Sequence, residues 1–380
     1  MKNYDTIVIG GGFSGLSMAL TLAKNGLKVG VLERKKEIGL PTHTSGIFIR
    51  KLIEDFSVPK EVIDNYISGF TFYSPFGKKY TMKFKGSEFF HVNIPKYEKE
   101  LANKCKQLKV DFYLNTNCTE INIKENLVKV NKKYKSKTLA LCCGSDTNFV
   151  KELLDDRVRK FLVGIEFLCQ GINVKIKDLP KCFFDYNIAP GYGLWLAPIK
   201  NNVSRVGLCR YFSSKINLKE ELKNYIKKNI KSNFKIKEIR SGLIPISGPI
   251  KKTYGNRFVV VGDAAGQIGA LSAGGIHYAL NIGRIAGEII SKNINNPTEE
   301  SLKEYEKLWK KKYYKLLKIE LILRKIYDRL DSNEKIENFI KILETDSFIK
   351  LGRCMAKMRM SKIDYVKFLL TTLTKFPLFL

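Results

Sequence analysis

Glycines near the start of the chain have the spacing of a dinucleotide-binding turn. Residues 4–9 are apolar and predict a buried strand, and Gly-Gly-Gly-Phe-Ser-Gly at residues 10–15 leads directly into an amphipathic helix. In such a turn the first glycine allows the tight bend, the second lets a pyrophosphate approach the backbone, and the third lets helix and strand pack closely. The N–H groups at the helix N-terminus bind phosphate. We therefore expect a dinucleotide to contact Gly10, Gly12, Phe13, Ser14 and Gly15.

An acidic residue stands where the ribose of a dinucleotide would bind. Residues 28–32 predict a second strand, which ends in Glu33. At this distance from the glycine turn, a carboxylate accepts hydrogen bonds from a ribose 2′-hydroxyl. We place Arg34, the next residue, in the same site. Together with the turn, Glu33 favours dinucleotide binding over a chance glycine-rich loop.

A second glycine-rich region, far along the chain, indicates which dinucleotide is bound. Residues 257–261 predict a strand, Gly-Asp-Ala-Ala-Gly follows at residues 262–266, and another glycine-led helix comes next. This arrangement resembles the flavin-binding element of hydroxylase-like FAD proteins, whose aspartate binds the ribityl chain and whose helix N-terminus faces the flavin pyrimidine. The resemblance implies FAD as the cofactor. It also implies FAD contacts at Gly262, Asp263, Ala265, Gly266, Gly274, Gly275 and Ile276.

The composition narrows the partners and the compartment. The 380 residues include 67 Lys and Arg against 37 Asp and Glu, a net charge of +30, and 44% are hydrophobic, enough for a sizeable core. This charge suits an anionic membrane surface or an acidic protein, and no nucleic acid is expected because no nucleic-acid motif accompanies it. The eight cysteines form no Cys-x-x-Cys pair, so we expect a cytoplasmic protein without a metal site. No apolar stretch reaches the roughly 18 residues of a spanning helix.

Strand-like segments in the middle of the chain predict a second sheet. They are residues 70–73, 79–84, 162–174, 193–196, 203–210 and 234–246. In open α/β proteins such an insertion covers the carboxyl ends of the first sheet's strands, where ligands bind. The expected fold is therefore α/β, with a Rossmann-like FAD-binding domain interleaved with an antiparallel substrate sheet and followed by C-terminal helices. The expected FAD-binding domain comprises residues 1–66, 88–158 and 252–290, the substrate sheet 67–87 and 159–251, and the helical region 291–380.

Residues 189–198 carry the clearest likeness to a known family. Their sequence, Ala-Pro-Gly-Tyr-Gly-Leu-Trp-Leu-Ala-Pro, resembles the signature of the geranylgeranyl reductase family, roughly APGGYxWxFP followed by GxG. Trp195, Pro198 and Gly207 fall on the pattern, whereas Tyr192 lies one place early and Cys209 replaces the last glycine. The glycine-rich regions follow the family order, so the likeness runs from residue 4 to about residue 310. It implies substrate contacts at Tyr192, Trp195 and Pro198.

Other positions depart from the family pattern. Family members often carry Pro-x-x-Cys-x-Gly after the acidic ribose ligand, but residues 41–46 read Pro-Thr-His-Thr-Ser-Gly, so Thr44 replaces the cysteine. Gly46 stays on the pattern and is expected at the cofactor. Ile94 stands where related flavoproteins place an arginine. His43 is the best-placed candidate for a proton donor, and the alternative is that it only hydrogen-bonds the loop or the flavin.

The chain after residue 290 is predicted to be helical and basic. Apolar residues recur at helix spacing from Leu302 onward, beside a run of lysines that includes Lys307 and Lys318. A solvated basic face on a packed helix is one interpretation, and docking to anionic lipid is the other. The apolar tail, residues 366–380, would close the core or touch a bilayer. Its large side chains are Phe368, Leu369, Leu370, Phe376, Leu378, Phe379 and Leu380.

The family likeness implies an activity. It is the FAD-dependent reduction of isolated carbon–carbon double bonds in the geranylgeranyl chains of prenyl lipids, a step of lipid biosynthesis carried out at the membrane periphery. Because no second glycine motif predicts an NAD(P)H domain, the electron donor is either transiently bound NAD(P)H or reduced ferredoxin. Two alternatives remain open. One is an FAD-dependent monooxygenase or halogenase on the same fold, and the other is a flavin-binding or basic scaffold protein without catalysis.

Overall fold

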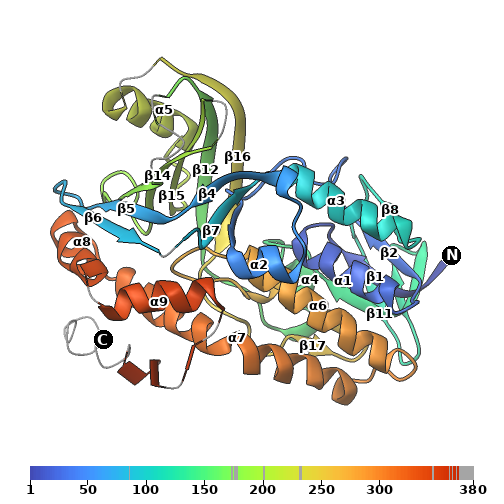
Figure 1. Ribbon diagram of the computed structural model, residues 1–380. Helices are drawn as coiled ribbons and strands as arrows, with labels where there is room; N and C mark the ends of the chain where they lie inside the picture. Colours follow the sequence, from blue (N-terminus) through green and yellow to red (C-terminus); the bar gives the residue numbers. More distant parts are fainter. Residues whose placement is uncertain are drawn as a thin grey trace. The chain divides into compact units, whose positions relative to one another are not determined.

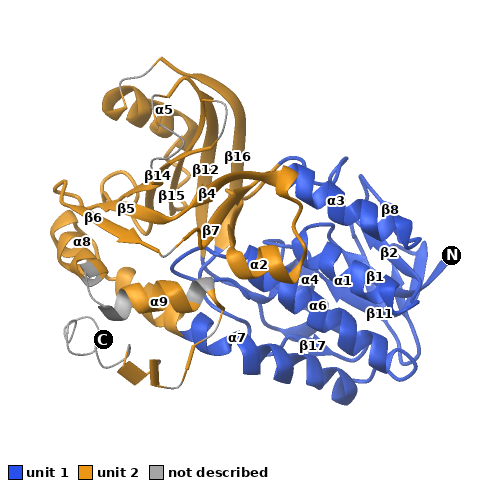
Figure 2. Cartoon of the chain, in the orientation of Figure 1, with its two compact units in different colours: residues 1–41, 94–160, 245–318 blue, residues 42–93, 161–244, 319–380 orange. Residues whose placement is uncertain are grey.

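The chain passes back and forth between two units, each assembled from three separate stretches (Figures 1 and 2). Unit 1 comprises residues 1–41, 94–160 and 245–318, and unit 2 comprises residues 42–93, 161–244 and 319–380. The structure is a computed structural model. It describes residues 1–84, 86–172, 174, 179–199, 202–230, 233–344, 346–358, 360–361, 363–364 and 366–367.

Unit 1 is built on a largely parallel sheet. Its central strand β1 (Lys2–Ile9) lies between β11 (Tyr134–Leu141) and β2 (Val29–Leu32), and both pairings are parallel. The second half of β1 is fully buried, as expected for a sheet covered on both faces. The order β17-β18-β11-β1-β2-β8 includes β17 (Tyr254–Gly255), β18 (Phe258–Val260) and β8 (Asp111–Tyr113), while β10 (Val128–Val130) pairs with β11 and with β9 (Ile121–Ile123).

Helices α1 (Phe13–Lys24) and α6 (Ile276–Asn293) lie close together in unit 1 because two glycines of α6 let the backbones approach. A Cβ on Gly283 would lie 2.6 Å from the carbonyl oxygen of Ser14, and one on Gly287 would lie 2.8 Å from the Cβ of Thr21. The other helical segments of unit 1 are α3 (Ile94–Gln107), α4 (Asn148–Leu154), the 3-10 turn η2 (Gly262–Ala265) and the first part of α7 (Glu299–Tyr327).

Unit 2 contains a seven-stranded sheet in the order β16-β12-β15-β14-β13-β5-β6. The pairs β12–β15, β15–β14, β14–β13 and β5–β6 are antiparallel, whereas β13 and β5 are parallel. This sheet and the parallel sheet of unit 1 confirm the predicted fold class. The strands are β5 (Gly69–Tyr73), β6 (Lys79–Lys83), β12 (Phe161–Gln170), β13 (Lys181–Phe183), β14 (Gly193–Pro198), β15 (Val203–Tyr211) and β16 (Lys235–Pro245).

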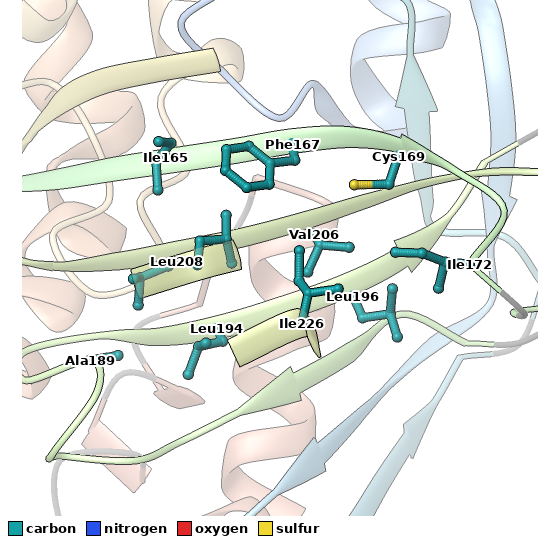
Figure 3. Packing of buried hydrophobic residues seen from close by; sticks show 11 residues of the cluster. Ile165, Phe167, Cys169, Ile172, Ala189, Leu194, Leu196, Val206, Leu208 and Ile226 are labelled. Atoms are coloured by element: carbon teal, nitrogen blue, oxygen red, sulfur yellow. The ribbon is translucent and has the colours of Figure 1, made fainter. Parts of the chain in front are cut away.

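One face of the seven-stranded sheet packs against helix α5 (Leu218–Asn229). Side chains alternate along each strand, so Leu194 and Leu196 of β14 and Leu208 of β15 point to the same side and pack with Ile226 of α5 (Figure 3). The residues between them, Trp195 among them, point to the opposite face. One face of the sheet is therefore apolar and covered by α5, whereas the other face carries Trp195.

A small sheet in the order β3-β7-β4 belongs to unit 2. β3 (Ile47–Ile49) and β4 (Ile63–Ile67) both pair antiparallel with β7 (Phe89–Val92). These strands pair with one another and not with the parallel sheet. Contacts such as the hydrogen bond from Asn65 Nδ2 to the Pro198 carbonyl join them to the seven-stranded sheet, and residues 42–93 lie in unit 2. Helix α2 (Arg50–Asp55) and the turn η1 (Lys60–Val62) belong to the same part of unit 2.

The C-terminal helices are divided between the two units. The first part of α7 belongs to unit 1, where Tyr305 OH donates to the carbonyl of Val260 at 2.8 Å and Trp309 Nε1 donates to Thr253 Oγ1 at 3.0 Å. The rest of α7 belongs to unit 2 with α8 (Asn333–Ile340), η3 (Lys341–Glu344) and α9 (Asp346–Ala356). Within the described part of the chain, no helix is long and apolar enough to cross a membrane. The tail residues Phe368, Leu369, Leu370, Phe376, Leu378, Phe379 and Leu380 lie outside the described residues.

Candidate cofactor and substrate sites

The first glycine turn has a backbone that only glycine can adopt. Gly10 has φ +105°, and a Cβ on it would lie 2.2 Å from the carbonyl oxygen of Cys142. Gly15 is equally confined, because a Cβ there would lie 1.9 Å from the carbonyl oxygen of Gly10. At Gly12, by contrast, a Cβ would meet no atom within 4 Å. Open space therefore lies beside Gly12 at the start of α1.

The N-terminus of α1 suits an anion. Gly12 is the N-cap residue, no side chain caps the first turn, and no acidic residue lies in that turn. Backbone N–H groups and the positive end of the helix dipole together favour phosphate at such a position. The predicted contacts Phe13 and Ser14 are buried in the first turn of the helix, and the Phe13 ring centroid lies 6.1 Å from that of Tyr97.

Glu33 is buried at the end of β2 and is held in place by the backbone. Oε2 accepts a 2.6 Å hydrogen bond from the Gly11 N–H, and Oε1 accepts a 2.8 Å hydrogen bond from the Lys35 N–H. A carboxylate oxygen has two lone pairs, so a ribose hydroxyl can donate to the same group. Arg34, which we expected beside it in the site, has an exposed side chain.

Glu98 of α3 is a buried neighbour of this region that the sequence did not reveal. Burial raises the pKa of Glu98 to about 7, with smaller effects from Lys35, which lowers it, and from Glu33, which raises it. A glutamate in an amphipathic helix is usually on the solvent face, so only the packing of α3 shows that this one is enclosed.

The two glycine-rich regions meet in unit 1. Strand β18 pairs with β11, and the chain leaves β18 through a 2.9 Å hydrogen bond from the Val261 N–H to the carbonyl of Leu141. Gly262 follows with φ +76°, and a Cβ on it would lie 2.9 Å from Ser14 Oγ. Two segments that are distant in the sequence thus form one cradle.

A side-chain network that the sequence did not indicate fixes the second turn. Gln267 Oε1 accepts a 2.8 Å hydrogen bond from the Gly262 N–H, and Gln267 Nε2 donates to Tyr305 OH at 3.0 Å. Gly266 closes the turn with φ +65°, where a Cβ would lie 2.2 Å from a backbone oxygen. In the sequence, Gln267 is marked only by being a polar residue inside an apolar segment.

Asp263 lies at the N-terminus of α6. A Cβ on Gly275, the N-cap residue of α6, would lie 3.2 Å from Asp263 Oδ1, and no side chain caps this helix. Burial raises the pKa of Asp263 to about 6. Burial also lowers the pKa of His277, in the first turn of α6, to about 3, so His277 is neutral near neutral pH. Of the remaining predicted contacts, Ala265 and Ile276 are buried and Gly274 is half-buried.

His43 and Gly46 lie in unit 2. His43 is exposed, and its Nδ1 lies 2.9 Å from the carbonyl oxygen of Ser241, so Nδ1 carries the proton of that hydrogen bond. Gly46 is buried with φ +72°, and its carbonyl accepts a 2.9 Å hydrogen bond from the Val92 N–H. These contacts hold the segment around Thr44 to β16 and β7.

The three predicted substrate residues lie on or just before β14. Trp195 is half-buried on the face opposite to α5. Alternation along the strand places Pro198 with Leu196 on the other face, and its carbonyl accepts a 2.9 Å hydrogen bond from Asn65 Nδ2. Tyr192 lies in the preceding turn, half-buried, and burial raises its pKa well above the usual value. The sheet therefore separates Pro198 from Trp195.

Comparisons with known proteins agree with this geometry. Residues 4–160, which contain the first glycine turn, match the pyridine nucleotide-disulphide oxidoreductase family. Over 349 residues the chain is 31% identical to a digeranylgeranylglycerophospholipid reductase of Methanocaldococcus jannaschii, a match that covers 87% of this chain and 88% of that one. The chain belongs to the geranylgeranyl reductase family. A relative with the same name from Methanococcus vannielii is 30% identical over 389 residues, covering 96% of this chain and 98% of its own length.

The fold of the chain is shared with a solved structure. A geranylgeranyl bacteriochlorophyll reductase-like protein from Thermoplasma acidophilum matches 100% of this chain and 98% of its own, with a TM-score of 0.84 and 19% identity. Identity this low shows the fold alone. The family resemblance read from the signature is confirmed, and the chain is an FAD-dependent oxidoreductase.

Buried charges near Trp195 are functional candidates that the sequence did not reveal. Glu166 of β12 accepts a 2.8 Å hydrogen bond from Trp195 Nε1. Arg205 of β15 donates to Asp64 Oδ2 at 3.4 Å and to His91 Nδ1 at 3.2 Å. Burial lowers the pKa of His91 well below its usual value, and nearby arginines lower it further, so this imidazole is neutral. In the sequence these residues are marked only as single charges within apolar strands. Such charges are common at strand edges, so they did not indicate a functional site.

Proposed function

We propose that this chain reduces isolated carbon–carbon double bonds in the geranylgeranyl chains of prenyl lipids. The observation that carries the proposal is the likeness to digeranylgeranylglycerophospholipid reductases, which covers 87% and 96% of the chain in two relatives. Bound FAD, once reduced, supplies a hydride in reactions of this class. A double bond that receives the hydride at one carbon also needs a proton at the other, which the protein or water must provide.

The geometry of the cradle in unit 1 supports FAD binding there. We infer that the N-terminus of α1 at Gly12 holds the pyrophosphate, that Glu33 accepts hydrogen bonds from the ribose, and that Asp263 accepts them from the ribityl chain. The N-terminus of α6 after Gly275 would stabilise negative charge on the flavin. Support comes from two helices without side-chain caps and from glycines that no other residue can replace. The other contacts proposed in unit 1 are Gly10, Phe13, Ser14, Gly15, Arg34, Gly262, Ala265, Gly266, Gly274 and Ile276. Gly46, which follows the family pattern in the sequence, is proposed as a further contact.

The substrate side of the proposal lies in unit 2. A prenyl chain has few polar groups, so its affinity comes from apolar burial, about 0.8 kcal/mol per CH₂. We place it against Trp195 and Tyr192, where the paired strands carry the small residues Gly193, Gly207 and Cys209. Pro198, on the opposite face of the sheet, would act indirectly, by fixing the end of β14. His43 is the proposed proton donor, because its Nδ1 is committed to a backbone carbonyl and Nε2 remains to hold or release a proton.

The electron donor and the membrane contact are part of the same proposal. NAD(P)H binding transiently and reduced ferredoxin are the two donors, and the net charge of +30 would attract an acidic carrier. Exposed lysines on α7 would bring the protein to an anionic lipid surface, where its substrate lies.

A turnover experiment tests the proposed function. The FAD-loaded protein is reduced anaerobically with dithionite, mixed with geranylgeranylated glycerophospholipid, and the lipids are examined by mass spectrometry. We expect lipid masses to rise by two hydrogens for each reduced bond, with matching reoxidation of the flavin. Flavin that stays reduced in the presence of the lipid would contradict the proposal. Hydroxylated or halogenated products that appear only with oxygen would instead identify a monooxygenase or halogenase.

A further inference from the structure

Trp195, Gly207 and Glu166 lie side by side on three neighbouring strands. The register pairs Trp195 of β14 with Gly207 of β15, and Gly207 with Glu166 of β12. Directly paired residues point to the same face of a sheet, so the three form one row across it. Because glycine is the middle member, no side chain separates the two outer ones.

Gly207 provides the space that the indole of Trp195 occupies. A Cβ on Gly207 would lie 2.0 Å from Cζ2 and 2.1 Å from Cε2 of the indole. The ring therefore covers the glycine and reaches across β15, where its Nε1 donates the 2.8 Å hydrogen bond to Glu166 Oε2. This contact gives a physical reason for the tryptophan and the glycine of the signature to occur together.

Glu166 is itself held from its other side. Its Oε1 lies 3.6 Å from Nη1 of Arg240 on β16, and Arg240 is bound in turn by Glu238 through contacts of 2.9 and 3.0 Å. Glu166 and Arg240 are only 4% and 6% exposed. Removing one partner of a buried ion pair leaves the other charge uncompensated, so this carboxylate has one favoured position.

We propose that Glu166 is a positioning residue, which fixes the indole of Trp195 over Gly207 and thereby sets the shape of the surface that binds the prenyl chain. This inference rests on the proposed function. A prenyl chain makes no hydrogen bonds that would orient it, so the shape of its apolar wall decides how it is held. Without Glu166 the indole N–H loses its acceptor, and the ring can turn about its two side-chain torsions.

The position of the indole can be measured without any substrate. The chain has two tryptophans, and Trp309 is buried in unit 1, so Trp309→Phe isolates the emission of Trp195. In that background we expect Glu166→Leu to shift the emission to longer wavelength and to increase quenching by acrylamide. Glu166→Gln keeps an acceptor for the indole N–H and should change both less. Glu220→Gln, which removes an exposed carboxylate of α5, should change neither.

A double-mutant cycle with Trp195→Phe tests the link to substrate binding. We expect Glu166→Leu to raise the KM for the geranylgeranylated lipid about tenfold while kcat and FAD content change less than about twofold. When residue 195 is already phenylalanine, Glu166→Leu should raise KM no further, because the two residues act through one contact.

Two results would overturn this role for Glu166. One is an additive effect of the two substitutions on KM, and the other is an unchanged Trp195 emission in folded Glu166→Leu and Glu166→Gln proteins. If Glu166→Leu does not fold, Glu166→Gln replaces it in the cycle, with a smaller effect on KM that again disappears with Trp195→Phe. If the wild-type protein turns over no prenyl lipid, the proposed function fails, and the emission measurements still decide whether Glu166 positions the indole.

Discussion

Glu33 is the residue on which the proposed ribose contact most directly depends. Its oxygens already accept hydrogen bonds from the N–H groups of Gly11 and Lys35. In Glu33→Gln one oxygen becomes an NH₂ donor that faces a backbone N–H donor, so both the loop and the ribose contact suffer. We expect FAD to bind at least about tenfold more weakly, measured by titrating the apoprotein and following flavin fluorescence.

The matched control for Glu33→Gln is Glu37→Gln. Glu37 lies four residues later, is exposed and pairs with Lys99 at the surface, so its loss should leave FAD affinity unchanged. Equal affinity in wild type and Glu33→Gln would contradict the placement of the ribose.

Asp263 should give the apoprotein a pH-dependent stability. Its pKa of about 6 lies above the ordinary value of 3.8, so the folded protein binds this proton more tightly than the unfolded chain does. Stability therefore falls as the pH rises from about 4 through about 6. Asp263→Asn lacks this loss. We expect the melting temperature of flavin-free Asp263→Asn, minus that of flavin-free wild type, to be larger at about pH 8 than at about pH 4. We also expect Asp263→Asn to contain less FAD than wild type.

Scanning calorimetry of the two flavin-free proteins at both pH values checks this prediction. A melting-temperature difference that stays constant with pH would show that Asp263 is well solvated in the folded chain. The physical reason for Asp263 to accept hydrogen bonds from the ribityl hydroxyls would then be lost.

Residues with local demands could be predicted from the sequence, and residues with distant partners could not. Gly10 has the positive φ of the turn, a Cβ on Gly15 would meet the carbonyl of Gly10 five residues earlier, and Glu33 follows from the spacing of that turn. Glu166 and Glu98 look like ordinary charged residues in the sequence. Only the pairing of β12 with β15 brings Glu166 next to an indole, and only the packing of α3 buries Glu98.

At the scale of elements, the contact between α1 and α6 should control FAD retention. A Cβ on Gly283 would lie 2.6 Å from the backbone oxygen of Ser14, in the first turn of α1. Gly283→Ala must therefore push α6 away from the phosphate-binding turn. We expect a loss of about 1–3 kcal/mol in unfolding free energy, by analogy with overpacked cores, and weaker FAD retention.

Urea unfolding and flavin release measure the two effects of Gly283→Ala. Glu288→Ala, on the exposed side of the same helix, is the control and should change neither. Wild-type stability in Gly283→Ala would mean that the helices separate at no cost.

The second part of α7 fixes the turn that precedes β14 in unit 2. Arg324, only 1% exposed, donates to the carbonyl of Gly191 at 2.7 Å and pairs with Asp328, and Tyr327 OH donates to the carbonyl of Tyr192 at 2.7 Å. A lysine cannot bind the Gly191 carbonyl and Asp328 at the same time, as the planar guanidinium does. We expect Arg324→Lys to lower the unfolding free energy by about 1–3 kcal/mol and to raise KM for the lipid, because the Tyr192 turn loosens.

Urea unfolding and steady-state kinetics give the two readouts for Arg324→Lys. Lys325→Ala, an exposed neighbour on the same helix, is the control. A variant as stable as wild type and with the same KM would show that the turn holds its shape without α7.

Strands could be predicted from the sequence more readily than their order. The expected segment at residues 203–210 corresponds to β15, and that at residues 79–84 corresponds to β6, because apolar and β-branched runs mark half-buried strands. The three-residue strand β13 carries no such run and was missed. Its parallel pairing with β5 joins segments far apart in the sequence, and nothing in the local pattern of either strand specifies it.

At the scale of the whole molecule, interleaving could be predicted, but the limits of units 1 and 2 depend on contacts that no local sequence pattern specifies. The distance between the two glycine-rich regions already required the chain to leave one domain and return. The boundaries depend on partners of short elements: β3, β4 and β7 pair with one another, and the first part of α7 attaches to unit 1 through Tyr305 and Trp309. Neither choice is visible in apolar periodicity.

The lysines of α7 are the surface on which the membrane proposal depends. Lys307, Lys311, Lys315 and Lys318 recur at helical spacing in the unit 1 part of α7, and all four are exposed. No ion pair within the described residues involves them, whereas Lys310 pairs with Glu306. Because each such lysine contributes about 1 kcal/mol near an anionic surface, changing all four to glutamate should abolish binding to vesicles that contain phosphatidylglycerol.

Co-sedimentation with these vesicles at low and high salt measures the effect, and a variant with the same charge change elsewhere isolates its cause. Lys215, Lys219, Lys227 and Lys228, all exposed on α5 or the loop before it, provide that control when changed to glutamate. We expect the control to bind vesicles nearly as well as wild type, and salt to weaken both, since exposed charges are screened within about 8 Å at physiological ionic strength. Equal losses in the two variants would assign the binding to the net charge of +30, and wild-type binding by the α7 variant would exclude this helix from the membrane contact.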